Sequence, residues 1–518
     1  MSSRRSPASR GAIVGKTTAS KMAETSEADA PETPDLLSTS QAGPAAVRGG
    51  AFRVGGYFLG ALVSVISAAL LFRYLGVVNI GRYVTAMSLV AIVGALSDLG
   101  LTAVGVRETS IRAAGERWQV ARELLGLRIT MTMLGGVVIT VIAAFAYSAT
   151  IATGVALASV GLLLQATQDN FALPLLVGLR LGWVAALELL RQVLTTMVVV
   201  LLVLAGAPFL SFLAISIPVG AVVLIVTAWR VWDTRALTPV FDWSRWRPLL
   251  AAVLPYAAAV AASALYFRVS ILLVSALSDP TQLGYFAASF RIVEVLAPVP
   301  ALLVGSAFPI FARAARDDHD RLGYSLGKVH EVAMIGGAWV AVSIAVGAPL
   351  AITIVGGAKF QPAEPVLAVQ GVGLGAMCVS AVWANGLLSL GLYRQILLIN
   401  VAALVFNALL VSALIPLDGA QGAAIGTVTA EIVAAIVLAL AVTRGRPRLR
   451  PSMRILPRVA LAAALGLTPL AMTGVPVIAR IAISTTLFGI VLLATGALPS
   501  ELRALIPHSL SRWKLAGR

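Results

Sequence analysis

The chain alternates between long apolar segments and short gaps that hold most of its arginines. Each apolar segment is near twenty residues long, the length of a helix that crosses a hydrocarbon core of about 30 Å. Composition agrees with this pattern, because 59% of the residues are hydrophobic and only 12% are charged. Soluble domains carry about twice that share of charge. The pattern therefore predicts an all-α, polytopic integral membrane protein.

Roughly fourteen segments are long and apolar enough to be membrane-spanning helices. They are predicted near 52–76, 83–106, 123–147, 150–178, 182–206, 209–231, 248–277, 282–312, 328–355, 364–391, 395–415, 419–443, 456–473 and 476–498.

The cations predict the orientation of these spans. The formal net charge is +16, but the basic residues are dispersed over every second gap and do not form one basic face. Short cytoplasmic loops of membrane proteins are enriched in lysine and arginine. We therefore expect the basic gaps and both termini in the cytoplasm. Arginine greatly outnumbers lysine and alanine is abundant, as in proteins of GC-rich bacterial genomes, so the spans are expected in a bacterial inner membrane. Dispersed cations also argue against a nucleic-acid partner. The basic gaps include Arg107 to Arg122, Arg230 to Arg247, Arg313 to Lys328 and Arg444 to Arg458.

Two outward hairpins suggest an internal repeat. The segments FRYLGVVNIGRYVTAMSLVAIVGAL and VSALSDPTQLGYFAASFRIVEVLAP both place glycine and tyrosine at the start of the returning helix, at Gly81–Tyr83 and Gly284–Tyr285. Parallel repeats occur in transporters that alternate access between two halves. The predicted organisation is a disordered cytoplasmic tail (1–50), an N-lobe of six spans (51–233), a basic linker (234–247), a C-lobe of six spans (248–443), a basic loop (444–455), two further spans (456–498) and a cytoplasmic tail (499–518).

At several of these segments the chain resembles the polysaccharide-biosynthesis (Wzx-type) flippases of the multidrug/oligosaccharidyl-lipid/polysaccharide (MOP) exporter superfamily. The resemblance covers almost the whole chain after the first tail. The segments that carry it are RYLGVVNIGRY, LSDLGL, VRE, LGYFAASFRIVEVL, AFPIFAR, GAKFQPAEPVLAVQ and LINVAALVFNALLVSALIPLDGAQGAAIGTVTAE.

The resemblance implies a V-shaped, MATE-like fold with two six-helix lobes and two extra C-terminal helices around a central cavity. It also implies transport of a polyprenyl-pyrophosphate-linked oligosaccharide from the inner to the outer leaflet. Membrane lipids are then partners, and a polysaccharide polymerase and glycosyltransferases are further expected ones. In one departure, Ser270 stands near the place where many relatives have an acidic residue in the seventh span, so cation coupling at that position is not expected.

Charged side chains inside spans are costly and are the default functional candidates. Arg268 in the seventh span and Arg291 in the eighth lie at matched depth, about nine residues or roughly 14 Å from the same turn. A guanidinium makes bidentate contacts with phosphate oxygens, so these two residues are candidates for binding a pyrophosphate. Glu294 leaves a second interpretation open, because it lies within pairing distance of Arg291 along the helix and can also accept an ion pair from Arg268.

Other candidates lie in the same spans or at their ends. Tyr266 is placed to stack on a sugar or to belong to an interfacial aromatic belt. Arg73 is either a cavity residue or an interfacial side chain that extends towards water. Asp98, Asp169 and Glu431 are candidates for coupling to Na⁺ or H⁺, and each is also explained as a structural hydrogen-bond acceptor. No other cofactor and no metal site is expected, because the single cysteine and three histidines are scattered.

Three other functions compete with oligosaccharide flipping. A peptidoglycan-precursor flippase would use the same anion site, whereas a drug–cation antiporter would favour an acidic cavity. A membrane glycosyltransferase needs clustered carboxylates on an outward loop, and the outward gaps are short, with scattered acids only. We therefore expect a transporter and not an enzyme.

Overall fold

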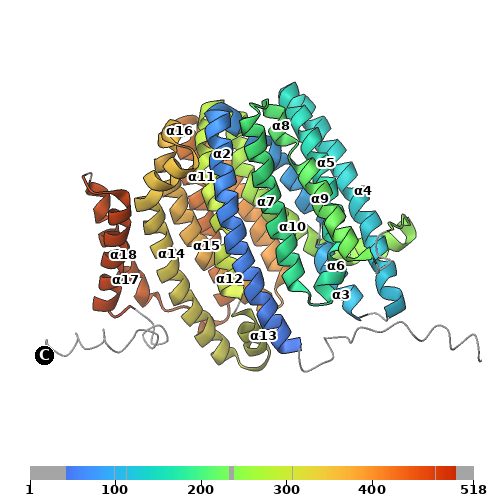
Figure 1. The fold of residues 1–518 in the computed structure, drawn as a ribbon. Helices are drawn as coiled ribbons and strands as arrows, with labels where there is room; N and C mark the ends of the chain where they lie inside the picture. The colour runs from blue at the N-terminus through green and yellow to red at the C-terminus, as the bar shows by residue number, and fades with distance from the viewer. Residues whose placement is uncertain are drawn as a thin grey trace, which may run out of the picture.

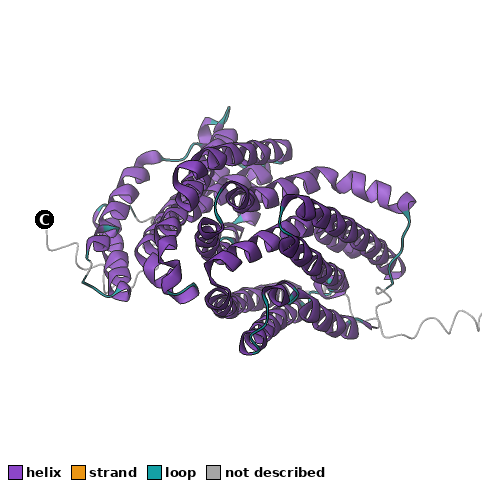
Figure 2. Ribbon diagram, turned by 90° about the horizontal axis from the view of Figure 1, so that it is seen from above, coloured by secondary structure: helices purple, strands orange, loops and turns teal. Residues whose placement is uncertain are grey.

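The computed structural model describes residues 42–98, 100–111, 114–232, 238–305, 307–472 and 474–497. These residues form a bundle of helices with no strand among them (Figures 1 and 2). Twelve of the helices are long and apolar enough to cross a membrane. A helix satisfies its own backbone hydrogen bonds, which lipid cannot do, so this architecture is the one that long apolar segments require. The chain is a multi-pass membrane protein.

The α-helices follow one another with short connections, and a few 3₁₀ turns lie between them. They are α2 (Ala42–Asp98), α3 (Leu101–Ile111), α4 (Ala114–Ala146), α5 (Ala149–Phe171), α6 (Leu173–Val177), α7 (Leu181–Leu204), α8 (Phe209–Leu213), α9 (Ser216–Arg230), α10 (Trp243–Leu277), α11 (Pro280–Leu296), α12 (Pro298–Gly305), α13 (Phe308–Asp317), α14 (His319–Val355), η3 (Ala358–Ala363), α15 (Glu364–Ser389), α16 (Tyr393–Thr443), η4 (Pro447–Leu449), η5 (Met453–Ile455), α17 (Leu456–Gly466), η6 (Thr468–Ala471) and α18 (Val477–Ala494).

Two of the helices are each a pair of crossings. A straight helix of 51 residues, the length of α16, would be about 76 Å long, more than twice a hydrocarbon core. Its helical geometry breaks at Asp418 and Gly419, and beyond the break Gly426 packs against Val411 of the first half. The 57-residue α2 has a corresponding break at Gly76, where φ is 71°. Twelve helices plus these two extra halves give the fourteen crossings expected from the sequence.

Several predicted edges are wrong by a few residues. Residues 42–50, predicted as tail, belong to α2, because extending a formed helix costs little. The second crossing ends at Asp98 and not near residue 106, because Gly100 takes a positive φ of 74°. The linker ends at Asp242, whose side chain caps α10 at Ser244 N, so 243–247 are helical. The remaining parts of the predicted tails and linker, 1–41, 499–518 and 234–237, lie outside the described residues.

The helix α2, which contains the first two crossings, packs against both halves of the molecule. α2 contacts α7 and α5 of the first six spans and also α10, α11 and α14 of the next six. A buried apolar cluster joins Phe72 and Ile80 of α2 to Ile352 of α14 and Phe360 of η3. The α17–α18 pair packs on α14 at one edge of the bundle (Figure 1). The two sets of spans are therefore in close contact near the break of α2.

Candidate functional site

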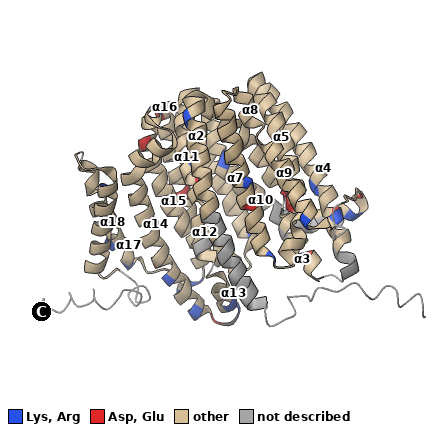
Figure 3. Cartoon of the chain, viewed as in Figure 1, with Lys and Arg blue, Asp and Glu red and all other residues tan. Residues whose placement is uncertain are grey.

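The interior charges of α10 and α11 converge on one carboxylate. Glu294 forms ion pairs with Arg268 on the neighbouring helix and with Arg291 one turn back on its own helix, at 2.7 Å for the second pair. The two arginines, which were expected at matched depth, thus share one ion-pair partner. Figure 3 shows that most of the ribbon in the middle of the bundle belongs to uncharged residues, with a few charged positions among them, whereas basic residues gather near the ends of α13 and α14.

The cluster reaches across to the first span. The second terminal nitrogen of Arg291 donates to the hydroxyl oxygen of Ser64 on α2, at 2.5 Å. The guanidinium carbon of Arg268 lies 5.7 and 5.6 Å from the ring centroids of Phe267 and Phe290, within the range of a cation–π contact. Helices from both predicted lobes therefore position this charge cluster.

The charge balance of the cluster is positive. Two guanidiniums share one carboxylate, which leaves one unit of positive charge among Arg268, Arg291 and Glu294. The side chains keep 20%, 32% and 23% of their surface exposed, so the cluster is not sealed inside the bundle. A partly exposed guanidinium in a low-dielectric interior binds an anion more strongly than one at the surface does. The arrangement suits a phosphate-bearing group better than a cation.

A separate cavity of about 470 Å³ lies among α10, α11, α12, α15 and α16. Glu431 lies in its wall and accepts hydrogen bonds from the Tyr266 hydroxyl and the Ser380 hydroxyl, both at 2.8 Å. Ser270 and Thr427 line the same cavity and share a hydrogen bond of 2.8 Å. Both hydrogen-bond partners of Glu431 are neutral hydroxyls, in contrast to the two arginines of Glu294.

Tyr266 and Arg268 face different neighbours although only one residue separates them. Tyr266 points to α16 and Arg268 to α11, because positions two apart on a helix lie on nearly opposite faces. The hydroxyl of Tyr266 is therefore bound to Glu431 and not to the arginine pair.

Arg73 is also remote from the arginine pair. Its guanidinium donates to the carbonyl oxygens of Thr353 and Ile354 at 3.0 and 3.1 Å, in the last turn of α14. A cation at a helix C-terminus satisfies carbonyls that have no partner within the helix. Arg73 thus joins the first span to the ninth.

The remaining acidic candidates have partners within the first six spans. Asp98 was expected well inside the second span but is the last residue of α2, where it pairs with the buried Arg128. Asp169 lies 3.6 Å from Arg191, which is also 3.6 Å from Glu188, as the spacing of Glu188 and Arg191 predicts. These contacts support the structural interpretation of Asp98 and Asp169.

Sequence reasoning missed two polar partners of the site. Ser380 lies in an apolar run of α15, and a hydroxyl in such a run is a weak signal of an interhelical contact. Ser64 carries no signal, because its contact with Arg291 joins residues 227 positions apart.

Comparison with known proteins shows the family of the chain. A family model described as polysaccharide biosynthesis protein matches residues 70–365, more than half of the chain. The chain belongs to the polysaccharide biosynthesis protein family. A search of the curated proteins finds no match.

Solved structures similar to this family member are membrane transporters. The lipid II flippase MurJ in an inward closed conformation aligns with a TM-score of 0.70 and 13% identity, over 85% of this chain and 97% of that chain. An inward-facing multidrug resistance MATE transporter of the MOP superfamily aligns with a TM-score of 0.56 and 16% identity, over 77% and 98%. A MOP superfamily transporter from Pyrococcus furiosus, described as having a binding pocket of reverse polarity, aligns with a TM-score of 0.52 and 14% identity, over 78% and 95%. The family member therefore has the MOP transporter fold.

Proposed function

We propose that this protein flips a polyprenyl-pyrophosphate-linked oligosaccharide from the inner to the outer leaflet of the bacterial cytoplasmic membrane, for cell-surface polysaccharide synthesis. The pyrophosphate and sugar enter between the two sets of six spans, and the prenyl tail stays in lipid. Rocking of the two halves then exposes the headgroup to the other side. Both termini lie in the cytoplasm in this proposal, and the protein catalyses no covalent chemistry.

The observation that carries the proposal is the positive cluster of Arg268, Arg291 and Glu294. A pyrophosphate competes with Glu294 for the two guanidiniums and forms charge-assisted hydrogen bonds with them. Because Arg291 also contacts Ser64 of the first span, binding at the cluster changes a contact between the two halves. This coupling is what alternating access needs, since a ligand shifts an equilibrium only through different contacts in the two states.

A flipping assay with purified protein in proteoliposomes tests the proposal. Arg268→Ala and Arg291→Ala should each reduce translocation of a fluorescent polyprenyl-pyrophosphate sugar by about 100-fold, the effect of losing roughly 3 kcal/mol of charged hydrogen bonds. Arg480→Ala is the matched control, because Arg480 lies on α18, away from the cluster, and its side chain donates to the carbonyl of Val475 just before that helix. Normal transport by both cluster variants would refute the proposed anion site.

The same charge argument applies to a peptidoglycan precursor, which also carries a pyrophosphate. One experiment distinguishes the oligosaccharide substrate from the peptidoglycan precursor. The protein is depleted from cells, and the lipid-linked sugar that accumulates on the cytoplasmic leaflet is identified. A drug–cation antiporter is less consistent with the positive charge of the cluster.

We further propose that Glu431 couples transport to Na⁺ or H⁺. An ionised carboxylate surrounded by neutral hydroxyls inside a membrane is costly, so it gains a cation or a proton. Glu431→Gln should leave flipping down a substrate gradient intact and remove its stimulation by an imposed Na⁺ or pH gradient, measured in the same proteoliposomes. Unchanged stimulation in Glu431→Gln would exclude this residue.

A further inference from the structure

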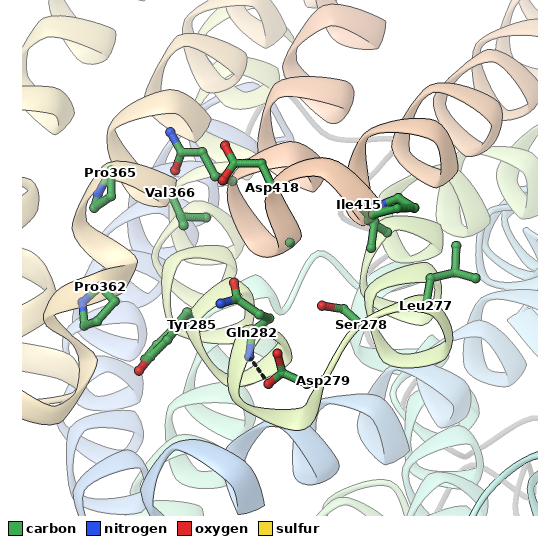
Figure 4. Close-up of a pocket in the computed structure, with 13 residues that line it drawn as sticks. Leu277, Ser278, Asp279, Gln282, Tyr285, Pro362, Pro365, Val366, Ile415 and Asp418 are labelled. Atoms are coloured by element: carbon green, nitrogen blue, oxygen red, sulfur yellow. Dashed lines mark hydrogen bonds between the residues drawn. The ribbon is translucent and has the colours of Figure 1, made fainter.

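A second cavity lies at the opposite end of α10 from its capped start. Its volume is about 620 Å³, and its walls come from the turn between α10 and α11, the start of α15 and the break in α16 (Figure 4). Pockets of this size hold small organic ligands. None of the residues assigned above to the anion site or to ion coupling lines it.

The break in α16 and the turn after α10 build this cavity together. Gly419 takes a φ of 49°, and the amide of the next residue, Ala420, donates to the side-chain oxygen of Gln282 at 3.1 Å. A Cβ at position 419 would lie 2.6 Å from that same oxygen, so the turn requires glycine. In this conformation the turn at Gly419 and the side chain of Gln282 therefore form one wall of the cavity.

Polar groups of the cavity are available to a ligand. Asp418 is exposed, and the Gln421 side-chain oxygen is buried without a hydrogen-bond partner among the described residues. Asp279 caps α11, and the backbone amide of Gln282 holds the pKa of its carboxyl below the usual range, so it is ionised at neutral pH. Figure 4 shows Ser278, Gln282 and Asp418 around the same opening.

The lining has a definite chemical preference. It contains two carboxylates and two side-chain amides but no lysine or arginine, so it disfavours a phosphate. The ring of Tyr285 and three prolines add apolar surface to these hydrogen-bonding groups. A single metal ion would fill only a small part of the volume. An uncharged, hydroxyl-rich ligand fits the size, the charge and the mixture of groups.

We propose that this cavity is a binding site for neutral sugar units, placed to receive the glycan as it leaves the transporter. The inference depends on the proposed function only for the source of the sugar. Leu277, which lines the cavity at the end of α10, follows Arg268 by nine residues, a separation of roughly 14 Å at 1.5 Å per residue. One substrate can therefore contact the cationic cluster with its pyrophosphate and this cavity with its sugar chain.

Saturation-transfer NMR on the full-length protein in detergent tests the site, with lactose, maltotriose and chitobiose as probes. At least one probe should give a signal that falls more than fivefold in Asp418→Asn and in Gln421→Ala. Gln361→Ala is the control, because this exposed amide lies in η3 beside the cavity but does not line it. Unaltered elution in size-exclusion chromatography verifies folding of each variant.

The outcomes separate this inference from the proposed function. Sugar signals should persist in Arg268→Ala, and excess pyrophosphate should not displace the sugars. The absence of any sugar signal, or equal signals in all variants, would overturn the inference. A Ca²⁺-dependent rise in thermal stability that Asp418→Asn removes, without sugar binding, would also overturn it in favour of a metal site. Normal flipping by Arg268→Ala and Arg291→Ala would refute the anion site and leave a positive sugar result standing.

Discussion

Single residues decide the charge of the central cluster. Glu294 holds two guanidiniums that would otherwise repel each other, and it leaves them with one net positive charge. Two unit charges 4 Å apart interact by about 4 kcal/mol at an effective dielectric constant of 20. The carboxylate therefore has two opposing effects, because it stabilises the fold and competes with an anionic ligand for the same donors.

Glu294→Gln should separate these two effects. The net charge of the cluster rises to two, so the affinity for inorganic pyrophosphate should increase about tenfold, equivalent to roughly 1.4 kcal/mol. The thermal midpoint of the ligand-free protein should fall, because the two guanidiniums lose their shared counter-ion. Isothermal titration and thermal unfolding in detergent measure both quantities. Weaker pyrophosphate binding in Glu294→Gln would contradict a competing role for the carboxylate.

At the scale of elements, two glycines from the suspected repeat let α2 and α11 approach closely. A Cβ at Gly284 would lie 2.3 Å from the carbonyl oxygen of Val77, and a Cβ at Gly81 would lie 2.9 Å from the side chain of Leu283. Gly284 thus makes room for the first hairpin at Val77, and Gly81 makes room for the second hairpin at Leu283. The two hairpins that are similar in sequence are therefore also in direct contact, through the glycines that they share.

Gly284→Ala should loosen this contact, because the added methyl group meets backbone and not a flexible side chain. Overpacking of this kind costs roughly 1–3 kcal/mol, so the thermal midpoint should fall and flipping should slow. Gly336→Ala is the matched control, since a Cβ there meets nothing within 4 Å. Equal thermal midpoints for the two variants would show that the close approach is not needed.

At the scale of the whole molecule, the two sets of six spans meet through α2. Its contacts with the second set include the Ser64–Arg291 hydrogen bond to α11, the Arg73 cap on α14 and the Phe72–Phe360 ring pair with η3 at 5.7 Å. Alternating access requires these contacts to separate and reform. In this conformation the two sets of six spans are therefore in contact towards the end of the bundle that contains the break of α2.

A reversible cross-link tests this motion. The variant carries Gly81→Cys and Leu283→Cys in a Cys378→Ala background, which removes the free cysteine of the described residues. A Cβ at position 81 would lie 2.9 Å from the Cγ of Leu283, so two cysteines at these positions are near enough for a disulfide. Oxidation should arrest flipping in proteoliposomes, and reduction should restore it to the rate of the untreated double variant. Oxidation should not change the flipping rate of either single-cysteine variant. Undiminished flipping by the oxidised double variant would show that this end does not open.

The sequence by itself determined the membrane class, the fourteen crossings and the interior position of Arg268 and Arg291, because hydropathy and charge are local properties that a helix retains wherever it packs. Helix edges differed where a cap or a positive-φ glycine acts, as at Asp242 and Gly100.

Only the tertiary structure decided which side chains meet. It paired both arginines with Glu294, brought Ser64 to Arg291 and placed Tyr266 on Glu431 in a separate cavity. It also formed the polar cavity between Asp279 and Asp418. These contacts depend on which helices become neighbours and how each is rotated, and a difference of two residues along a helix sends a side chain to the opposite face.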